Sequence, residues 1–533
     1  METNKVSKVL IWSLVILIVL GGIVYGFLKL NIINPESTVK ESAKEDKIEL
    51  ESIKVGMFPF TQNTYPKCAV ESTELAFNYN LFESLATFNQ KNILVPVIAS
   101  KWDNPNDLTW RFYLSPKAKF SNGDPVTAED VKFTFDYIRS NKDLPFSVSL
   151  PDAEAKVGDD NTVLFTTKNP DPLLLNKIAW SLLILSKKDV EANGLSNKNI
   201  GSGPYILSEV TDQSVKLITN ENYWREKPKI KNVTYTVVKQ EDKITSLING
   251  SVDLIGYLTT DQNEAKLIEA SKQGKVDLRK VAMTAINFLE LDSMRDKTPS
   301  IDLPVNPLKD KRVREAIAMG LDIDDFVKNV PDTVPSNQLV SQSVFGYNPK
   351  ISRTKRDVTK AKALLKEAGY ENGFTMSIDF PDTSTAKEMY SKFATNLSDI
   401  NIKVTLNGFT QEEFFPVIMS KETSAYFISF SPDTQDASEV LEGLIHTPSE
   451  VYGQYNLGYS NPVLDKEIED ASKTLNQQVR QQKVQAAMKT AMDDYAKIPL
   501  FQYSSNYALS SKINWEPRLD GMVRFYEMAG KSE

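Results

Sequence analysis

Residues 9–28, VLIWSLVILIVLGGIVYGFL, form an apolar run without a charged side chain. A helix needs about 20 apolar residues to cross a hydrocarbon core roughly 30 Å thick, so the run predicts a transmembrane helix. Lys5 and Lys8 precede it, and the positive-inside rule then places residues 1–8 in the cytoplasm. The rest of the chain is expected to fold outside the cytoplasm, attached to the membrane through this helix.

A cleaved signal peptide is the alternative explanation of the same run. The residues that follow it contain no small-x-small cleavage site and no nearby cysteine for lipid attachment, so an uncleaved anchor is favoured. Residues 29–47 are expected to be a flexible linker, because most of them are polar or charged. The body from Ile48 onwards is too long for one compact core and predicts two or three domains.

The composition argues against several classes of function. A formal net charge of −8 disfavours a nucleic-acid partner, which needs a basic face. The single cysteine, Cys68, allows no internal disulfide, and the single histidine, His446, argues against a metal site built from histidine and cysteine. Most nucleophile–base pairs also need histidine. We therefore expect neither an enzyme nor a bound metal or cofactor.

Strand and helix patterns alternate irregularly along the body, which predicts an α/β fold. Residues 108–138 give the clearest pattern: a strand at 108–114, then a turn, then a helix. Thr127 is predicted to cap this helix with Asp130 as the acid of a capping box, which gives both residues a structural role. Helices are also predicted over residues 71–88 and about 465–496.

Two glycines, Gly201 and Gly203, precede a proline and a predicted strand in GSGPYILSEV. They suggest either a positive φ or a close approach of two backbone segments. The segment is not a phosphate-binding loop, because no Lys-Ser/Thr pair and no helix follow it.

The stretch ISFSPDTQDASEV, residues 428–440, raises a functional question. A β-branched and aromatic run stops at Pro432, Asp433 and Asp436 follow three residues apart, and a helical pattern then begins. Either the acids only cap the helix, or one of them binds a cationic ligand. From the residues alone both interpretations remain open.

Several stretches of the body together indicate a family. In chain order they are NLFESLATF, LTWRFYLSPKAKFSNGDPVTAEDVKFTF, GSGPYIL with NENYWREKPKIKNVTYTVV, KITSLINGSVDLI, KDKRVREAIAMGLDIDDFV, TKAKALLKEAGY, GYSNPVLDKEIEDA and IPLFQYSSNYAL. They span about 80 to 510, and the body resembles the solute-binding proteins of bacterial ABC importers. The resemblance is to family 5, the class that handles peptides and, in some members, nickel complexes.

The resemblance implies a two-lobed clamshell of the periplasmic-binding-protein type. Lobe I would comprise residues 48–282 with an extra subdomain at about 81–199, and lobe II residues 283–498. Residues 499–533 would return to lobe I. A peptide or similar solute would be enclosed between the lobes by hinge closure and handed to an ABC permease driven by ATPase subunits. The body is expected to be monomeric.

The resemblance also implies a site. In peptide-binding members the ligand lies extended against strand edges, and a carboxylate of lobe II neutralises its amino terminus; the matching residue is Asp433. An ammonium enclosed without a partner would cost roughly 3–5 kcal/mol. Asp436 is then expected to be the helix cap. Further candidate ligand contacts are Phe430, Tyr459 and Asn456.

Dipeptide-binding members grip the ligand's carboxylate with an arginine after the strand that matches FTMSIDFP. Here no arginine lies between Phe374 and Lys387, which favours peptides longer than dipeptides. Two alternatives remain: an anchored ligand-sensing receptor of the same fold, and a binder of a metal complex such as a nickel chelate, to which His446 could contribute.

Overall fold

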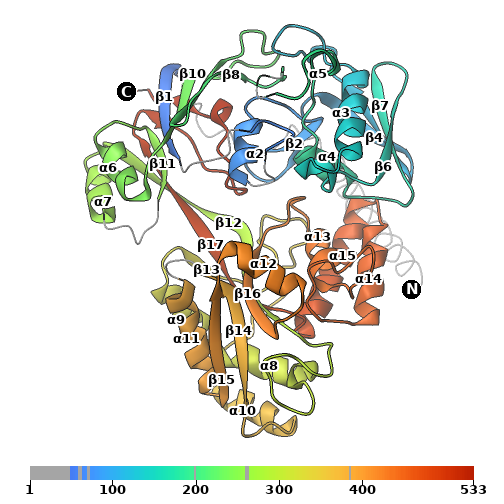
Figure 1. Cartoon of the computed structure of the whole chain (residues 1–533), viewed down its shortest axis with the longest axis vertical. Helices are drawn as coiled ribbons and strands as arrows, with labels where there is room; N and C mark the ends of the chain where they lie inside the picture. The colour runs from blue at the N-terminus through green and yellow to red at the C-terminus, as the bar shows by residue number, and fades with distance from the viewer. Residues whose placement is uncertain are drawn as a thin grey trace, which may run out of the picture. The chain divides into compact units, whose positions relative to one another are not determined.

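The computed structural model describes the body of the chain (Figure 1), namely residues 48–57, 63–68, 72–196, 198, 200–257, 263–382 and 386–532. The predicted anchor at residues 9–28 and the linker at residues 29–47 lie outside these ranges. None of the described helices combines the length and the apolar character that a membrane crossing requires.

The fold is built around one mixed sheet, as expected for an α/β protein. Within the described residues its strands run in the order β15-β14-β16-β12-β17-β11-β1-β10-β9-β8, with β13 paired to β17. Their bounds are β1 Leu50–Met57, β8 Tyr205–Val210, β9 Ser214–Thr219, β10 Ile230–Val237, β11 Leu254–Tyr257, β12 Val276–Leu291, β13 Thr333–Pro335, β14 Phe374–Pro381, β15 Ile402–Phe409, β16 Ala425–Phe430 and β17 Ile498–Ser510.

A second sheet, in the order β4-β5-β7-β6, is antiparallel and separate from the first. The short strands β2 and β3 form a hairpin beside it, and β18 pairs with β19 near the C-terminus. The bounds are β2 Ala86–Phe88, β3 Leu94–Pro96, β4 Ala99–Asn106, β5 Thr109–Leu114, β6 Ala153–Val157, β7 Thr162–Thr167, β18 Ile513–Asn514 and β19 Ala529–Gly530.

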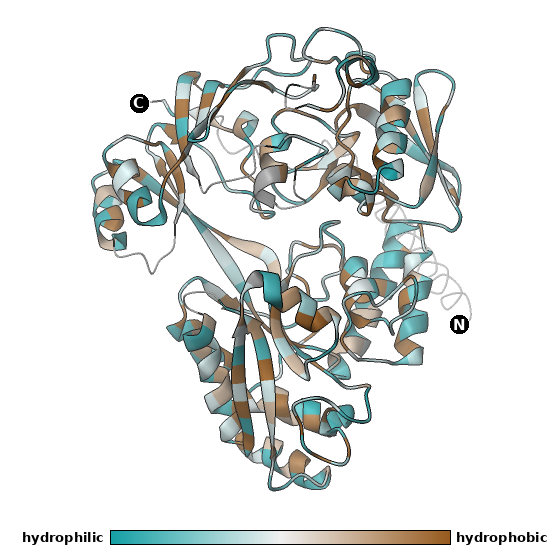
Figure 2. Cartoon of the chain, viewed as in Figure 1, coloured by the Kyte–Doolittle hydropathy of each residue, from teal (hydrophilic) through white to brown (hydrophobic). Residues whose placement is uncertain are grey.

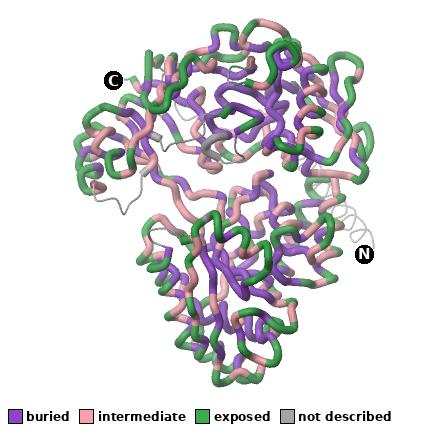
Figure 3. The backbone as a smooth tube through the Cα atoms, in the orientation of Figure 1, coloured by how far each residue is buried: buried purple, intermediate pink, exposed green. Residues whose placement is uncertain are grey.

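Helices cover the faces of both sheets (Figure 1). They are α2 Ser72–Asn78, α3 Ala128–Ser140, α4 Leu174–Ser181, α5 Lys187–Asn193, α6 Lys243–Ile248, α7 Glu264–Lys272, α8 Lys311–Gly320, α9 Ile323–Asn329, α10 Val358–Glu367, α11 Ala386–Ser398, α12 Gln411–Met419, α13 Ala437–Val440, α14 Pro462–Ser472 and α15 Gln477–Asp493. Many of the strands carry hydrophobic residues (Figure 2), and the buried segments gather around them (Figure 3).

Buried side chains form three main cores. The first core draws on residues from Ile53 to Leu254 and from Leu509 to Met528. The second core draws on Leu289 to Phe501, and the third core lies beside it, from Phe288 to Ala496. The long strands β12 and β17 pair along most of their length and are the main link between the strands of these cores.

The predicted capping box is confirmed at the start of α3. Thr127 Oγ1 accepts a hydrogen bond from the Asp130 backbone N–H at 3.3 Å, and Asp130 Oδ2 accepts one from the Thr127 N–H at 2.9 Å. The helix is amphipathic in the expected way, because Val131, Phe135 and Ile138 on its inner face are fully buried. Both polar residues therefore have a structural role.

Two predicted helices are shorter than expected. The helix predicted over residues 71–88 ends at Asn78, and residues 86–88 form strand β2. The buried Asn80 donates its side-chain amide to the Ala76 carbonyl at 2.9 Å, and such local bonds compete with helix propagation. The helix predicted over residues 465–496 is two helices, α14 and α15, because Asn476 caps a new start with a bond from the Val479 N–H.

The glycine motif before β8 is a close approach of two backbone segments, which is one of the two alternatives that the sequence left open. A Cβ atom built on Gly201 would lie 2.0 Å from the Leu81 carbonyl oxygen, and one on Gly203 would lie 2.5 Å from the Leu81 carbonyl carbon. The Gly203 N–H donates to the same carbonyl at 2.9 Å. The two glycines thus allow this segment to pack against the end of the α2 region.

Replacing Gly201 by alanine is expected to destabilise the body by about 1–3 kcal/mol, because the new methyl group forces the Leu81 backbone away. Thermal unfolding of the purified full-length chain measures the effect. Gly256→Ala is the matched control, since its Cβ would meet only the Asn506 carbonyl oxygen at 3.8 Å. An unchanged unfolding temperature for Gly201→Ala would show that the approach is looser than described.

Candidate functional site

The acidic loop, residues Ser431–Asp436, connects β16 to α13. A tight turn shapes it: the Gln435 N–H donates to the Pro432 carbonyl at 3.1 Å, and the Gln435 side-chain amide donates to the same carbonyl at 3.0 Å. Gln435 has a φ of +55°, a left-handed conformation that is unusual for a residue other than glycine. The turn displays the carboxylate of Asp433.

Asp433 is the unusual acid of this loop. Among the residues that the structure describes, its carboxylate has no hydrogen-bond donor and no cation. Burial, together with the charge of Glu439, raises the pKa of Asp433 to about 8. Burial of a carboxylate without a partner disfavours its charged form, which is why the pKa rises.

Glu439, on α13, binds the backbone of the same loop. Its carboxylate accepts hydrogen bonds from the Asp433 N–H at 3.2 Å, the Thr434 N–H at 2.8 Å and the Thr434 hydroxyl at 2.6 Å. Burial nevertheless raises the pKa of Glu439. This acid fixes the backbone of the loop, so the two neighbouring carboxylates have different roles. This role of Glu439 was not predicted from the sequence.

Asp436 caps α13, as predicted, with its Oδ1 accepting from the Ser438 N–H at 2.9 Å. It also forms a bidentate ion pair that was not predicted from the sequence: Arg480 on α15 donates to both carboxylate oxygens of Asp436 at 2.8 Å. The side chains of Asp436 and Arg480 are 2% and 6% exposed, and Arg480 donates further to the Ser438 hydroxyl at 2.8 Å. Asp436 is therefore fully engaged within the protein.

The other sequence candidates lie in different surroundings. Phe430 is half-buried at the end of β16, with its ring centroid 6.3 Å from that of the exposed Tyr455. Tyr459 is 2% exposed in the third core, and its hydroxyl donates to Asp494 at 2.6 Å. These positions leave Phe430 beside the acidic loop, while Tyr459 is held inside the protein.

Asn456 is buried, and its side chain bonds mainly to the surrounding loop, with a longer bond from the Lys497 ammonium at 3.4 Å. Its amide donates to three backbone carbonyls at 2.8–3.2 Å and its oxygen accepts from two backbone N–H groups at 2.9 and 3.1 Å, with partners Ile445, His446, Gly458 and Tyr459. Ligand contacts by Tyr459 and Asn456 stay predictions, and the geometry gives each a structural role.

His446 is also an internal residue. It is 6% exposed, stacks on Tyr452 with ring centroids 4.3 Å apart, and bonds through Nδ1 to the Thr447 carbonyl at 2.8 Å. Across the described part of the chain, no cluster of three or more His, Cys, Asp or Glu side chains is arranged to hold a metal ion.

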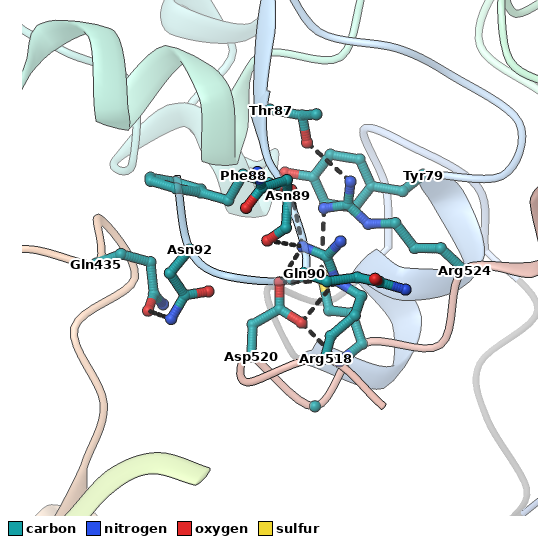
Figure 4. Close-up of polar contacts among 12 residues, drawn as sticks. Tyr79, Thr87, Phe88, Asn89, Gln90, Asn92, Gln435, Arg518, Asp520 and Arg524 are labelled. Atoms are coloured by element: carbon teal, nitrogen blue, oxygen red, sulfur yellow. Dashed lines mark hydrogen bonds and ion pairs between the residues drawn. The ribbon is translucent and has the colours of Figure 1, made fainter. Parts of the chain in front are cut away.

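The acidic loop touches residues of the first core as well as those of the third. Asn176 on α4 donates to the Thr434 carbonyl at 2.7 Å, and Asn92, in the turn between β2 and β3, donates to the Gln435 side-chain oxygen at 2.8 Å (Figure 4). The charge of Asp433 also contributes to raising the pKa of Tyr79, although burial is the main cause. The unpartnered carboxylate therefore lies where two cores meet.

Residues 94–450 match the profile of the bacterial extracellular solute-binding proteins, family 5 (middle region). The chain belongs to this family. The family and the α/β binding-protein fold predicted from the sequence are confirmed. As a family 5 protein, the chain is an extracytoplasmic solute-binding protein of an ABC importer.

Similar proteins cover most of the chain. The dipeptide-binding protein of Escherichia coli (strain K12) is 24% identical over 420 residues, covering 69% of this chain and 76% of that protein. The substrate-binding protein CtaP from Listeria monocytogenes superposes with a TM-score of 0.77 at 20% identity, over 91% of this chain and 100% of CtaP. The oligopeptide-binding protein AppA from Bacillus subtilis, solved with a nonapeptide, gives a TM-score of 0.71 at 17% identity over 91% of this chain and 100% of AppA.

Proposed function

We propose that this family 5 protein captures peptides longer than dipeptides and that Asp433 binds their amino terminus. The observation that carries the proposal is the half-buried carboxylate of Asp433, which has no partner among the described residues and a pKa raised to about 8. A peptide ammonium would supply the missing charge and hydrogen-bond donors. The similar proteins named for dipeptides and oligopeptides support peptides in general as the substrate class.

The length preference rests on what the site lacks. No arginine lies between Phe374 and Lys387, so the stretch after β14 offers no guanidinium to fix a carboxylate at dipeptide length. A longer peptide does not need its carboxylate held at one point, because its backbone can pair with strand edges along the site. Phe430 and Tyr455 would supply apolar surface next to the amine.

The expected lobes are part of the proposal. Lobe I, residues 48–282 with the subdomain at about 81–199, would contain the first core, and lobe II, residues 283–498, would contain the third core and most of the second. Residues 499–533 would return to lobe I along β17, whose early residues, Leu500 and Phe501, still pack in the second core. The strands β12 and β17 would then form the hinge on which the lobes close around the peptide.

The membrane arrangement is also proposed from the sequence. The apolar run at residues 9–28 would anchor the protein by a single helix, with residues 1–8 in the cytoplasm and the body outside. The anchor would keep the body near the permease and ATPase subunits that accept the peptide. We assign no catalytic role to any residue.

Purification of the full-length chain followed by native mass spectrometry tests the substrate class. The expected result is a set of added masses that correspond to a mixture of short peptides. A protein that carries no peptide and takes up none from an added random peptide pool would contradict the proposal. Cleavage of the added pool would instead indicate a hydrolase.

Peptide affinity is expected to depend on pH through Asp433, whose pKa is raised to about 8. Below that pH the free protein holds a proton on this carboxylate, which must leave before an ammonium can bind, so affinity falls by up to about tenfold per pH unit from 8 to 6. Above pH 8 the peptide amine itself loses its proton. Isothermal titration calorimetry in buffers of different ionisation enthalpy should show that the protein releases about one proton per bound peptide near pH 6.5.

A peptide affinity that stays constant between pH 6 and 8, with no proton release, would remove Asp433 as the amine partner. The variant Asp433→Asn is the internal control, because it has no carboxyl group to titrate and its weaker binding should be independent of pH in this range.

A further inference from the structure

A hydrogen bond between Asn92 and Gln435 joins two segments that lie far apart in the sequence. Asn92 Nδ2 donates to Gln435 Oε1 at 2.8 Å, across 343 residues of chain. Asn92 follows Phe88 of the first core, whereas Gln435 lies in the acidic loop between Phe430 and Val440 of the third core. Figure 4 shows the two side chains pointing toward each other.

Both partners are held in left-handed backbone conformations. Asn92 has a φ of +58° and Gln435 a φ of +55°, and for residues with a side chain such conformations are uncommon and cost free energy. Asn92 Oδ1 is also buried without a hydrogen-bond partner among the described residues. A left-handed glutamine and an unsatisfied buried oxygen at one contact indicate that the surrounding structure holds the contact in place for a reason other than local stability.

The turn that presents Asn92 is fixed from the first core. Asn89 Oδ1 accepts from the N–H groups of Lys91 and Ile93 at 2.9 and 3.1 Å. The fully buried Arg518 of the C-terminal segment donates to the Phe88 carbonyl at 2.8 Å, and its charge is balanced by Asp520 and Glu527 (Figure 4). Contacts within the first core therefore fix the turn that presents the Asn92 amide to Gln435.

Gln435 in turn shapes the segment that carries Asp433. Its side-chain amide donates to the Pro432 carbonyl at 3.0 Å while its oxygen accepts from Asn92. On the other flank of Asp433, Asn176 donates to the Thr434 carbonyl at 2.7 Å. Asn176 and Asn92 thus contact the loop on the two sides of Asp433 in the chain. Asn92 does so through the side chain of Gln435, which also stabilises the turn.

We propose that Asn92 is a positioning residue for peptide capture: its hydrogen bond to Gln435 holds the acidic loop against the first core while a peptide is bound and slows peptide release. Asn92 does not need to touch the peptide, because it acts through Gln435 on the loop that carries Asp433. The inference rests on the proposed peptide-binding function and adds a residue that sets the lifetime of the complex.

The test uses peptide exchange on the purified full-length chain. The protein is loaded with an isotope-labelled random peptide pool and chased with the unlabelled pool, and native mass spectrometry follows the exchange. Asn92→Gly removes the side chain but keeps a residue that accepts the positive φ. It is expected to speed exchange about 3–10-fold, the effect of one lost hydrogen bond, with an unchanged rate of loading.

Two comparisons make the result specific. Asn161→Gly is the matched control, because Asn161 also has a positive φ, +56°, in the turn between β6 and β7, and its exchange rate should equal that of the unmodified protein. In a Gln435→Gly background, Asn92→Gly should have little further effect, since the short bond is already gone and only the 3.5 Å bond from Asn92 to the Ser343 hydroxyl remains.

Unchanged exchange in Asn92→Gly, or an equal acceleration with and without Gln435, would overturn the proposal. These outcomes differ from a failure of the proposed function itself, in which the unmodified protein takes up no labelled peptide at all.

Discussion

The variant Asp433→Asn is expected to bind peptides at least about 100-fold more weakly than the unmodified protein. Without the carboxylate, the peptide ammonium would enter a partly dry site with no negative partner, and removal of one member of a buried charge pair costs roughly 2–5 kcal/mol. Isothermal titration of the full-length variant with peptides recovered from the unmodified protein measures the loss.

The same variant is expected to be more stable than the unmodified protein when no peptide is added. The pKa of Asp433 is raised to about 8 in the folded protein, well above its ordinary value of about 3.9. The folded state therefore holds a proton that the unfolded state has lost, so this acid lowers stability progressively as the pH rises from about 4 to 8. Asparagine has no such dependence, and the unfolding temperature at pH 8 should rise by roughly 2–4 °C.

The combination of weaker binding and greater stability distinguishes a binding residue from a structural one. Glu422→Gln, at an exposed acid just before β16, is the control and should change neither property. A variant Asp433→Asn that unfolds at a lower temperature would mean that the carboxylate supports the loop, and the assignment of Asp433 as amine anchor would be wrong.

Asp436→Ala, three residues along the chain, is expected to have the opposite effect on stability. It leaves Arg480 buried without its bidentate carboxylate partner. An uncompensated buried charge lowers the free energy of unfolding by about 3–5 kcal/mol. The unfolding temperature should fall by roughly 3–5 °C, as measured by scanning calorimetry. Arg480→Ala is expected to produce a similar fall.

The double variant Asp436→Ala with Arg480→Ala should be destabilised by less than the sum of the two single variants, because neither charge is then left alone. Asp136→Ala breaks an exposed ion pair with Lys132 on α3 and should leave the unfolding temperature unchanged. Strictly additive effects of Asp436 and Arg480 would show that the two side chains act independently.

Local sequence patterns predicted much of the fold. The capping box at Thr127 and the strand β14 each depend on side chains near one another in the chain. The approach of Gly201 to Leu81 joins distant segments, and from the sequence it was only one of two alternatives. The predicted helices were wrong where an asparagine intervened: the buried Asn80 donates to the preceding turn, and the exposed Asn476 caps the start of a new helix. Neither role is visible in hydrophobic periodicity, which treats asparagine simply as polar.

The candidate site was predicted only in part. Asp433 and Asp436 stand out in the sequence because they follow a strand, and the cap at Asp436 depends on residues next to it. The partners that separate their roles come from distant segments: Arg480 from α15, Asn176 from α4 and Asn92 from the β2–β3 turn. Spacing along the chain carries no signal for these contacts, which exist only after the cores have assembled.

A single titration can show whether the amino terminus of a peptide binds at Asp433. A peptide recovered from the full-length protein is synthesised in two forms, with a free amino terminus and with an acetylated one, and each is titrated into the protein at pH 8. The free form should bind at least about 100-fold more tightly, because acetylation removes the positive charge that Asp433 requires. Equal affinity for the two forms would contradict this assignment.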